Sequence, residues 1–236
     1  INMPRIAYLA KDEADFYADN VVVEDGAIRF DFHYPSGVLS GVALGVPAWV
    51  NIENSVAAMA VAWLMGATAE ELRSGVESFL GVRRRFDVHV NAPQVSYIDD
   101  YAHHPQELAA TIQSVKTLYP DRYVIAVFQP HLYSRTRDFA DDFARVLSEM
   151  DEVVLLPIYP AREEPIAGVT SEWLMGRLGD EVKKVLAEPN VVGKYLRLRL
   201  KQCLAKGQNV VVLTMGAGDI DQQVEDIKRN LTYKIL

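Results

Sequence analysis

The chain has 236 residues, 50% of them hydrophobic and 24% charged, which is typical of a globular protein of one or two domains. Its net charge of -8 argues against a nucleic-acid partner, because neutralising phosphates requires a basic surface. The most apolar stretch, Val56 to Met65, is shorter than the roughly 20 residues of a membrane span, so no membrane insertion is expected. The single cysteine, Cys203, excludes an internal disulfide and favours a reducing compartment such as the cytoplasm.

The first part of the chain, up to Gly81, predicts a small α+β unit. Short strands in an antiparallel meander are expected at Arg5–Leu9, Asn20–Val23, Ala27–His33 and Val38–Leu44. A helix is expected at Asn51–Met65, and a second helix opens with the capping-box pair Thr68 and Glu71. The first helix is apolar on nearly every side from Val56 on, so it is expected to be buried.

After Gly81 the pattern changes to strands that alternate with helices. Strands are expected at 95–99, 123–128, 152–156, 183–187 and 209–214, and helices at 105–118, 135–149, 170–178, 191–205 and 219–231. Repeated units of this kind predict an α/β fold with a doubly wound, mostly parallel sheet. We place the boundary between the two parts near residue 90, giving domains at 1–90 and 91–236.

The densest polar cluster follows the expected strand at 95–99. It consists of Asp99, Asp100, Tyr101, His103 and His104, and Pro105 directly after it marks a helix start. A strand end that meets a helix N-terminus is where open α/β sheets bind ligands, and anions are favoured there. The alternative is a polar turn with an Asp cap and solvated histidines. Adjacent strand residues point to opposite faces, so we expect no dedicated metal site.

A second cluster, FQPHLYSRTRDF at 128–139, again joins a strand to a helix. Arg135 and Arg137 lie in the first helical turn, where the macrodipole disfavours cations, and a broken local rule often marks a functional site. If the two strands are neighbours, Arg135 and His103 would face one pocket, and the guanidinium would suit a carboxylate or phosphate. The alternative is pairing of the arginines with Asp138, Asp141 and Asp142 on a solvated face.

Four other segments carry weaker signals. RRRFD at 83–87 is either a solvated hinge or the source of a guanidinium for a polyphosphate. Asn51 and Asn54 either cap their helix or read a purine edge. The segment 215–218, with Gly216 and Gly218, is half of a dinucleotide fingerprint at most. The loop at 157–169 is either a mobile flap or a plain surface loop. No GxxxxGK[ST] occurs, so any phosphate cradle must come from other sequence.

In this order and spacing, the two clusters and RRRFD resemble the Mur ligases, as do AREEPIAGV at 161–169 and GAGDI at 216–220. The resemblance implies a three-domain enzyme with a UDP-sugar domain, a central ATPase domain and a C-terminal Rossmann-like domain for the incoming amino acid. Residues 1–90 would then be the last part of the central domain and 91–236 the whole C-terminal domain. The start at Ile1, without an initiator methionine, also suggests a fragment.

The activity that the resemblance implies is ATP-dependent amide formation through an acyl phosphate. The motifs are most similar to those of family members that join L-alanine to the lactyl carboxylate of UDP-N-acetylmuramate in peptidoglycan biosynthesis. A murein-tripeptide recycling ligase of the same family, or a non-catalytic binding module, are the alternatives. ATP and Mg²⁺ are the implied cofactors, with the magnesium ligands expected upstream, so the fragment alone is not expected to turn over.

The resemblance also implies a nucleotide site. Asn51 and Asn54 would contact adenine, Arg85 would reach the ribose and phosphates, and Asp99 would bind the ribose hydroxyls. Val50 departs from the family pattern, because a histidine commonly precedes the Asn pair.

The substrate site would lie in the second part of the chain. His103 and Arg135 are the implied catalytic residues, and Arg135 would clamp the alanine carboxylate. Three residues would line the pocket for the amino acid and the acyl phosphate: Tyr101, His103 and His131. Leu132 stands where many relatives have a second arginine, so carboxylate binding would rest on Arg135 alone or recruit Arg137.

Overall fold

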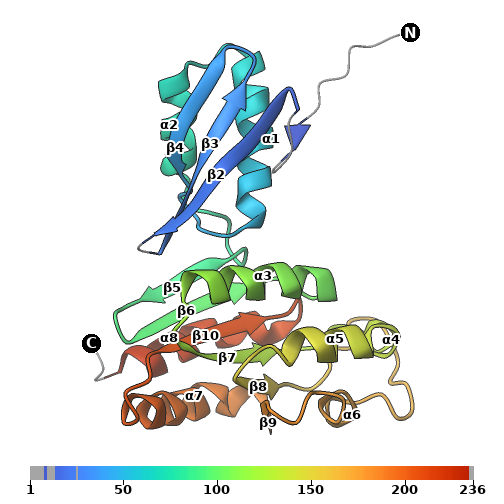
Figure 1. Ribbon diagram of the computed structural model, residues 1–236. Coiled ribbons are helices and arrows are strands. Elements are labelled where there is room, and N and C mark those ends of the chain that lie inside the picture. Colours follow the sequence, from blue (N-terminus) through green and yellow to red (C-terminus); the bar gives the residue numbers. More distant parts are fainter. Residues whose placement is uncertain (1–7, 10–13, 25, 234–236) are drawn as a thin grey trace. The chain divides into compact units, whose positions relative to one another are not determined.

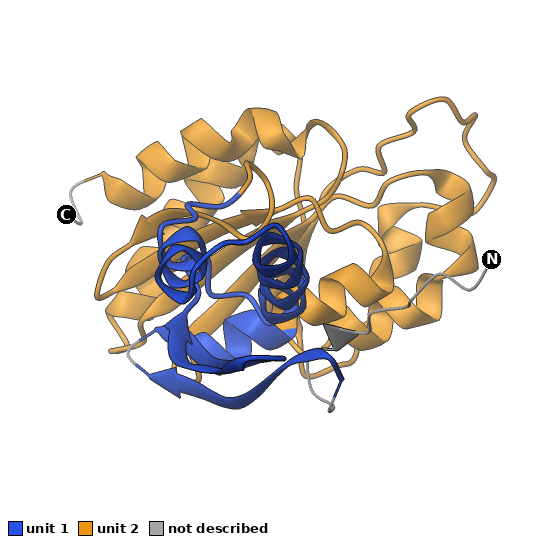
Figure 2. Ribbon diagram, turned by 90° about the horizontal axis from the view of Figure 1, so that it is seen from above, with its two compact units in different colours: residues 1–81, 113–118 blue, residues 82–112, 119–236 orange. Residues whose placement is uncertain are grey.

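The computed structural model describes residues 8–9, 14–24 and 26–233. The chain divides into two compact units, one of residues 1–81 with 113–118 and the other of residues 82–112 with 119–236 (Figure 2). Each unit has its own sheet.

The first unit contains a four-stranded sheet in the order β1-β2-β3-β4 (Figure 1). Its strands are β1 (Tyr8–Leu9), β2 (Phe16–Glu24), β3 (Ala27–Tyr34) and β4 (Gly37–Ala43). Strands β2 to β4 are antiparallel as expected, but β1 pairs with β2 in parallel. Of the expected strand Arg5–Leu9, only the last two residues lie within the described part of the chain.

Strand β2 begins four residues before the expected strand. Phe16 and Ala18 are buried and alternate with more exposed neighbours, as a half-buried strand requires. At Asn20 the backbone turns to a φ of 46°, and the register with β3 shifts between Asp19 and Val22. This irregularity interrupts the alternation, and the sequence pattern therefore located only the second half of the strand.

Helix α1 (Val50–Leu64) is buried along one stripe and not all round. The buried residues are Ile52, Val56, Met59 and Ala60, at the spacing of a single helical face. Val61 and Met65 have exposed fractions of 62% and 84%, so the expectation of complete burial is wrong. The reason is that a helix on one side of a single sheet can bury only the stripe that faces it.

Helix α2 (Ala69–Glu77) starts with the expected capping box. The Glu71 amide donates to the Thr68 hydroxyl over 3.3 Å, and the Thr68 amide donates to the Glu71 carboxylate over 2.8 Å. Both amides belong to the group that has no partner inside the helix, so the pair satisfies two donors at once.

The second unit is built on a six-stranded sheet in the order β5-β6-β10-β7-β8-β9. The strands are β5 (Asp87–Asn91), β6 (Val95–Asp100), β7 (Tyr123–Phe128), β8 (Glu152–Leu155), β9 (Lys183–Leu186) and β10 (Val210–Met215). Only β5 is antiparallel to its neighbour. The expected α/β fold with a mostly parallel sheet is therefore confirmed, while the short edge strand β5 was not expected.

Helices connect these strands and cover both faces of the sheet (Figure 1). They are α3 (Pro105–Leu118), α4 (Tyr133–Asp138), α5 (Ala140–Leu147), α6 (Ser171–Met175), α7 (Pro189–Leu204), the 3₁₀ turn η1 (Asp219–Gln223) and α8 (Val224–Thr232). Buried residues of α7 and α8 share one core with Val127 and its neighbours on the sheet. The next residue, Phe128, points to the opposite face, where its ring lies 5.3 Å from that of Phe143 in α5.

Two expected helices differ from the observed ones. The single helix expected at 135–149 is divided at Phe139, whose φ of -115° and ψ of 21° interrupt the helix between α4 and α5. The Phe139 ring packs edge-on against His104, with centroids 4.7 Å apart. The helix expected at 219–231 begins as the 3₁₀ turn η1. Among the described residues no helix is both long and apolar enough to cross a membrane.

Candidate functional site

Three loops leave the second unit's sheet at the carboxyl ends of β6, β10 and β7. Met215 at the end of β10 is level with Asp100 of β6 and with Phe128 of β7. The expectation that β6 and β7 are direct neighbours is wrong, because β10 lies between them. The loops that follow these three strands nevertheless emerge at one edge of the sheet, where parallel α/β sheets bind ligands.

Asp99 is completely buried, and both of its carboxylate oxygens are engaged. The Thr214 hydroxyl donates to Oδ1 over 2.5 Å, and Nε of Arg84 donates to Oδ2 over 3.2 Å. Arg84 also donates to the carbonyl of Gly216 over 2.5 Å and so links β6 to the loop after β10. Burial raises the pKa of Asp99, while Thr214 and Arg84 act in the opposite direction.

Asp100 holds the RRRFD segment against the end of β6. Its Oδ2 accepts from the amide of Phe86 over 2.9 Å, and its Oδ1 accepts from the amide of Ala102 over 2.8 Å. Arg84 and Phe86 have φ values of 62° and 48°, a left-handed conformation that is uncommon for residues with a side chain. Burial raises the pKa of Asp100 against the effect of the two amides. The segment is therefore a tightly fixed turn.

Tyr101 is the centre of a group of cationic and imidazole side chains. The guanidinium carbons of Arg84 and Arg85 lie 5.0 and 5.2 Å from its ring centroid, and the His103 ring lies 5.2 Å away. Arg85 is exposed, and no acid in the described part of the chain forms an ion pair with it. Of the two arginines, Arg84 is thus occupied by internal contacts, while Arg85 is accessible to a ligand.

His103 is oriented by the first turn of α3. Its Nδ1 lies 2.9 Å from the carbonyl oxygen of Tyr101 and 3.3 Å from Oε2 of Glu107. The same Glu107 oxygen accepts from the amides of His103 and His104 over 2.9 and 3.1 Å. Burial alone would raise the pKa of Glu107, but these amides and the charge of His103 bring it below its ordinary value. The helix start is therefore satisfied by Glu107 and not by an Asp.

His131 brings the loop after β7 to His103. The two rings lie 5.7 Å apart edge to face, and Nη1 of Arg135 lies 3.4 Å from Nδ1 of His131. No carboxylate of the described residues forms an ion pair with Arg135. The structure thus brings together four of the expected residues, namely Tyr101, His103, His131 and Arg135. The guanidinium of Arg135 is partly buried and forms no ion pair with an acid among the described residues.

His131 is expected to titrate below the ordinary histidine pKa of about 6.5. Partial burial lowers the pKa of His131, and the positive charges of Arg135 and His103 lower it further. The imidazole is therefore neutral at physiological pH and can accept from Arg135. In an NMR titration of the 236-residue chain, Arg135→Ala should move the His131 pKa back up and Arg137→Ala should not. A value for the unmodified chain above 6.5 would contradict this account.

Arg137 behaves differently from Arg135. It forms an ion pair with Asp138 at 2.8 Å, and both side chains are exposed. Asp141 pairs with Arg177 at 3.9 Å, and Asp142 pairs with Arg145 at 3.4 Å. The solvated-face interpretation therefore holds for Arg137, and only Arg135 of the two is left for a ligand.

Asn51 and Asn54 belong to the first unit, at the start of α1. Asn51 donates to the carbonyl of Val46 over 3.1 Å, and Asn54 donates to the side-chain oxygen of Asn51 over 3.1 Å. The residue at the cap position is Trp49, and no side chain caps the helix. The two amides thus form a small network of their own.

Close packing accounts for the glycines after β10. A Cβ on Gly216 would lie 2.8 Å from the Gln129 carbonyl oxygen, and a Cβ on Gly218 would lie 2.7 Å from the Tyr159 ring. The Gln129 side chain donates to Asp219 over 2.7 Å and accepts from the Ile220 amide over 2.9 Å. The glycines therefore allow the loops after β7 and β10 to approach each other.

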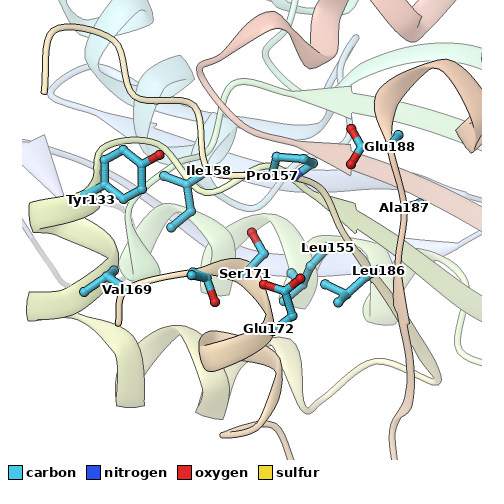
Figure 3. Close-up of a pocket in the computed structure, with 11 residues that line it drawn as sticks. Tyr133, Leu155, Pro157, Ile158, Val169, Ser171, Glu172, Leu186, Ala187 and Glu188 are labelled. Carbon is cyan, nitrogen blue, oxygen red and sulfur yellow. The ribbon is translucent and has the colours of Figure 1, made fainter. Parts of the chain in front are cut away.

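A cavity of about 320 Å³ lies beyond the ends of β8 and β9 (Figure 3). It is lined by Tyr133, Leu155, Pro157, Ile158, Val169, Thr170, Ser171, Glu172, Leu186, Ala187 and Glu188. None of the site residues expected from the sequence is among them. Within the described residues, no group of three or more His, Cys, Asp or Glu side chains could hold a metal ion.

Comparison with known proteins places the chain in a family. A family model described as "Mur ligase, glutamate ligase domain" matches residues 84–218, more than half of the chain. The chain belongs to the Mur ligase family. Its matched region contains every site residue that we expected in the second unit.

Individual Mur ligases match nearly the whole chain. The UDP-N-acetylmuramate–L-alanine ligase of Parabacteroides distasonis is 49% identical over 231 residues, 98% of this chain and 48% of that protein. The enzyme of the same name from Porphyromonas gingivalis strain W83 is 49% identical over 93% of this chain and 46% of its own length. The chain thus spans about half the length of the curated relatives that it matches.

A solved Mur ligase structure supports the fold. The crystal structure of UDP-N-acetylmuramate-alanine ligase from Thermotoga maritima has a TM-score of 0.75 at 21% identity, and the alignment covers 97% of this chain and 47% of that one. At this identity the likeness concerns the fold alone. The α/β architecture of the chain is that of a Mur ligase.

Sequence reasoning missed several residues that hold this group of side chains in place. Arg84 has no local signal that separates it from its neighbours in a run of three arginines. Thr214 is signalled weakly, as a polar residue in the apolar strand Val210–Met215. Glu107 stands at a capping position of α3 that could have been recognised. Glu163 lies in the motif AREEPIAGV, but its bond to Ser134 in α4 joins two distant segments and could not be read from the sequence.

Proposed function

We propose that the chain is part of an ATP-dependent ligase that joins L-alanine to the lactyl carboxylate of UDP-N-acetylmuramate. The observation that carries the proposal is the Arg135 guanidinium, which forms no ion pair with an acid among the described residues. It lies beside the imidazole of His131, whose ring is 5.7 Å from that of His103. The names and 49% identity of the curated relatives support this choice of substrates. Residues 1–90 would be the end of a central ATPase domain, and residues 91–236 the amino-acid-binding domain.

In this proposal Arg135 binds the L-alanine carboxylate through two parallel hydrogen bonds, which its planar guanidinium favours. The amine then attacks the carbonyl carbon of the muramyl acyl phosphate. The C–N bond forms, phosphate leaves with the electrons of the C–O bond, and the amine loses a proton. His103 in its neutral form would take that proton, with Glu107 and the Tyr101 carbonyl fixing its ring. Tyr101 and His131 would line the same pocket.

The nucleotide would be bound by Asn51 and Asn54 at adenine and by Arg85 at the ribose and phosphates. The exposure of Arg85 beside Tyr101 supports its role. Asp99 is buried, so we propose that it contributes mainly by fixing Arg84. The phosphate cradle and the ligands of Mg²⁺ would be supplied by the remainder of the ligase, because this chain has no P-loop. We propose the cytoplasm as the location of the reaction.

Asp99→Ala in the full-length ligase is expected to weaken ATP binding. The loss would be about 1–3 kcal/mol, because Arg84 without its carboxylate partner would no longer fix the turn that carries Arg85 to the nucleotide. Asp221→Ala is the matched control, since Asp221 lies 3.7 Å from the same guanidinium and is partly exposed. Calorimetric titration with ATP measures both variants. Equal affinities for ATP in Asp99→Ala and the unmodified enzyme would remove Asp99 from the nucleotide site.

The function itself is tested by assaying the full-length protein with ATP, UDP-N-acetylmuramate and single amino acids. We expect ADP release that depends on both the UDP-sugar and L-alanine, with a product heavier by one alanine residue. Activity with a murein tripeptide in place of L-alanine would instead identify a recycling ligase. Absence of ADP release with every acceptor would indicate a non-catalytic module.

A further inference from the structure

The residue directly after His131, on the way to Arg135, has a strained backbone. Leu132 has a φ of 71° and a ψ of 134°, a conformation that residues with a side chain rarely adopt. Its amide donates to the carbonyl of Tyr159 over 2.9 Å, and its carbonyl accepts from the amide and hydroxyl of Thr136 over 3.1 and 2.7 Å. Such a conformation persists only where its surroundings hold it, and it is concentrated at functional sites.

The surroundings are supplied by residues 159–163 of the loop between β8 and α6, which we call the strap. Tyr159, at its start, donates its amide to the carbonyl of Pro130 over 2.8 Å. The Tyr159 ring stacks on His131 with centroids 5.6 Å apart and planes 18° apart, and its Cβ packs against Gly218. The first end of the strap therefore fixes the imidazole and the residue after it.

Glu163, at the other end of the strap, is bound to the first turn of α4. Its Oε2 accepts from the amide of Ser134 over 2.9 Å, and its Oε1 accepts from the Ser134 hydroxyl. These hydrogen bonds lower the pKa of Glu163, so the side chain is a carboxylate at neutral pH. Ser134 precedes Arg135 directly, and α4 has only six residues and no side-chain cap of its own. The two ends of the strap thus bracket the strained turn.

We propose that Glu163 is a positioning residue for amino-acid binding. It holds Ser134, and through Ser134 it keeps the Arg135 guanidinium beside His131 in the orientation that receives the substrate carboxylate. This inference rests on the proposed function and extends it to a residue that does not touch the substrate. A carboxylate in direct contact with the substrate carboxylate would repel it, so the contribution of Glu163 is geometric.

The test uses three variants of the full-length ligase. Glu163→Ala removes both acceptors and should raise the apparent KM for L-alanine about tenfold, with the KM for ATP within about twofold, because small displacements of a clamp are costly. Glu163→Gln keeps an acceptor for the Ser134 amide, so its KM for L-alanine should stay within about threefold of the unmodified enzyme. Glu164→Gln removes the same charge from the exposed neighbour and should change nothing.

Two results would overturn the strap proposal: no change in Glu163→Ala, or an equal rise in the KM for L-alanine and for ATP. Arg135→Ala separates this failure from that of the proposed function. If Arg135→Ala raises the KM for L-alanine and Glu163→Ala does not, only the strap proposal fails. If Arg135→Ala has no effect, the carboxylate clamp itself is wrong.

A second variant guards against misfolding of Glu163→Ala. Ser134→Ala deletes the hydroxyl donor but keeps the amide, and should raise the KM for L-alanine by about threefold. Hydrogen exchange of the 236-residue chain provides a readout without catalysis. The Leu132 amide, which bonds to Tyr159 and not to Glu163, should exchange at least about fivefold faster in Glu163→Ala if the strap acts as one unit. Unchanged exchange at Leu132 would contradict the proposal.

Discussion

Glu152→Ala is expected to lower the free energy of unfolding of the second unit by about 3–5 kcal/mol, the usual cost of breaking a buried ion pair. The Glu152 side chain is completely buried at the start of β8, and that of Arg199 in α7 is 12% exposed. Arg199 Nε lies 3.0 Å from Oε1 and Nη2 lies 2.6 Å from Oε2, while Lys183 and Tyr195 also donate to Oε1. Removing the carboxylate leaves a largely buried guanidinium without its partner of opposite charge, and of its acceptors among the described residues only the neutral Gln202 and Tyr123 remain.

Denaturant unfolding of the 236-residue chain at neutral pH measures this effect. Asp142→Ala is the matched control, because Asp142 and its partner Arg145 are exposed at 55% and 66% and such pairs contribute at most about 1 kcal/mol. A loss of less than about 1 kcal/mol in Glu152→Ala would show that the attraction within the ion pair barely exceeds the free-energy cost of burying its charges.

The same pair has a predictable dependence on pH. Burial would raise the pKa of Glu152, but the hydrogen bonds from Arg199 and Tyr195 and the charges of Arg199 and Lys183 outweigh it and bring the pKa below its ordinary value of 4.5. A depressed pKa means that the stabilisation is present above the ordinary value and is lost as the pH falls through the lower, folded-state pKa. The difference in stability between Glu152→Ala and the unmodified chain should therefore narrow in acid below about pH 4.

Arg135→Ala in the full-length ligase is expected to raise the apparent KM for L-alanine by roughly 30- to 150-fold, which corresponds to about 2–3 kcal/mol for a lost charge-assisted contact. The KM for ATP should change little. The reason is that Arg135 has no acid partner among the described residues, so its charge is available to the substrate carboxylate. Leu132 offers no second guanidinium beside it, so no neighbouring charge can compensate.

Two further variants sharpen this result. Arg137→Ala removes an equal charge two residues along the helix, but from an exposed pair with Asp138, and should leave the KM for L-alanine unchanged. Arg135→Lys keeps the charge but loses the two-pronged geometry, and should fall between the alanine variant and the unmodified enzyme. An unchanged KM in Arg135→Ala would remove the carboxylate clamp from the proposed function.

Much of the fold could be predicted because its signals are local. The apolar run Tyr123–Phe128 indicated a strand covered on both faces, and Pro105 indicated the start of α3. The position of β10 could not be predicted, because strand order depends on which edges pair in space and leaves no trace in periodicity. The break at Phe139 was missed for a similar reason, since its ring packs against His104, a residue far away in the sequence.

The site was predicted in part. Tyr101, His103, His131 and Arg135 do lie together, although the argument for their proximity assumed that β6 and β7 are adjacent. Distinguishing Arg84 from Arg85 required the left-handed turn that directs one guanidinium inward and leaves the other exposed. The burial of Asp99 likewise depends on Thr214, a residue more than one hundred positions away in the chain.

By itself, the sequence determined the α/β class, the alternation of strands and helices, and which residue types gather at the strand ends, because these follow from periodicity, capping and turn chemistry along the chain. Tertiary structure alone decided which of those side chains are free for a ligand and which are consumed by internal partners. The physical reason is that a charge is available to a ligand only when it is not already held in an ion pair with a neighbouring group of opposite charge. That depends on contacts between segments remote in sequence, as between Glu163 and Ser134 or between Arg84 and Gly216.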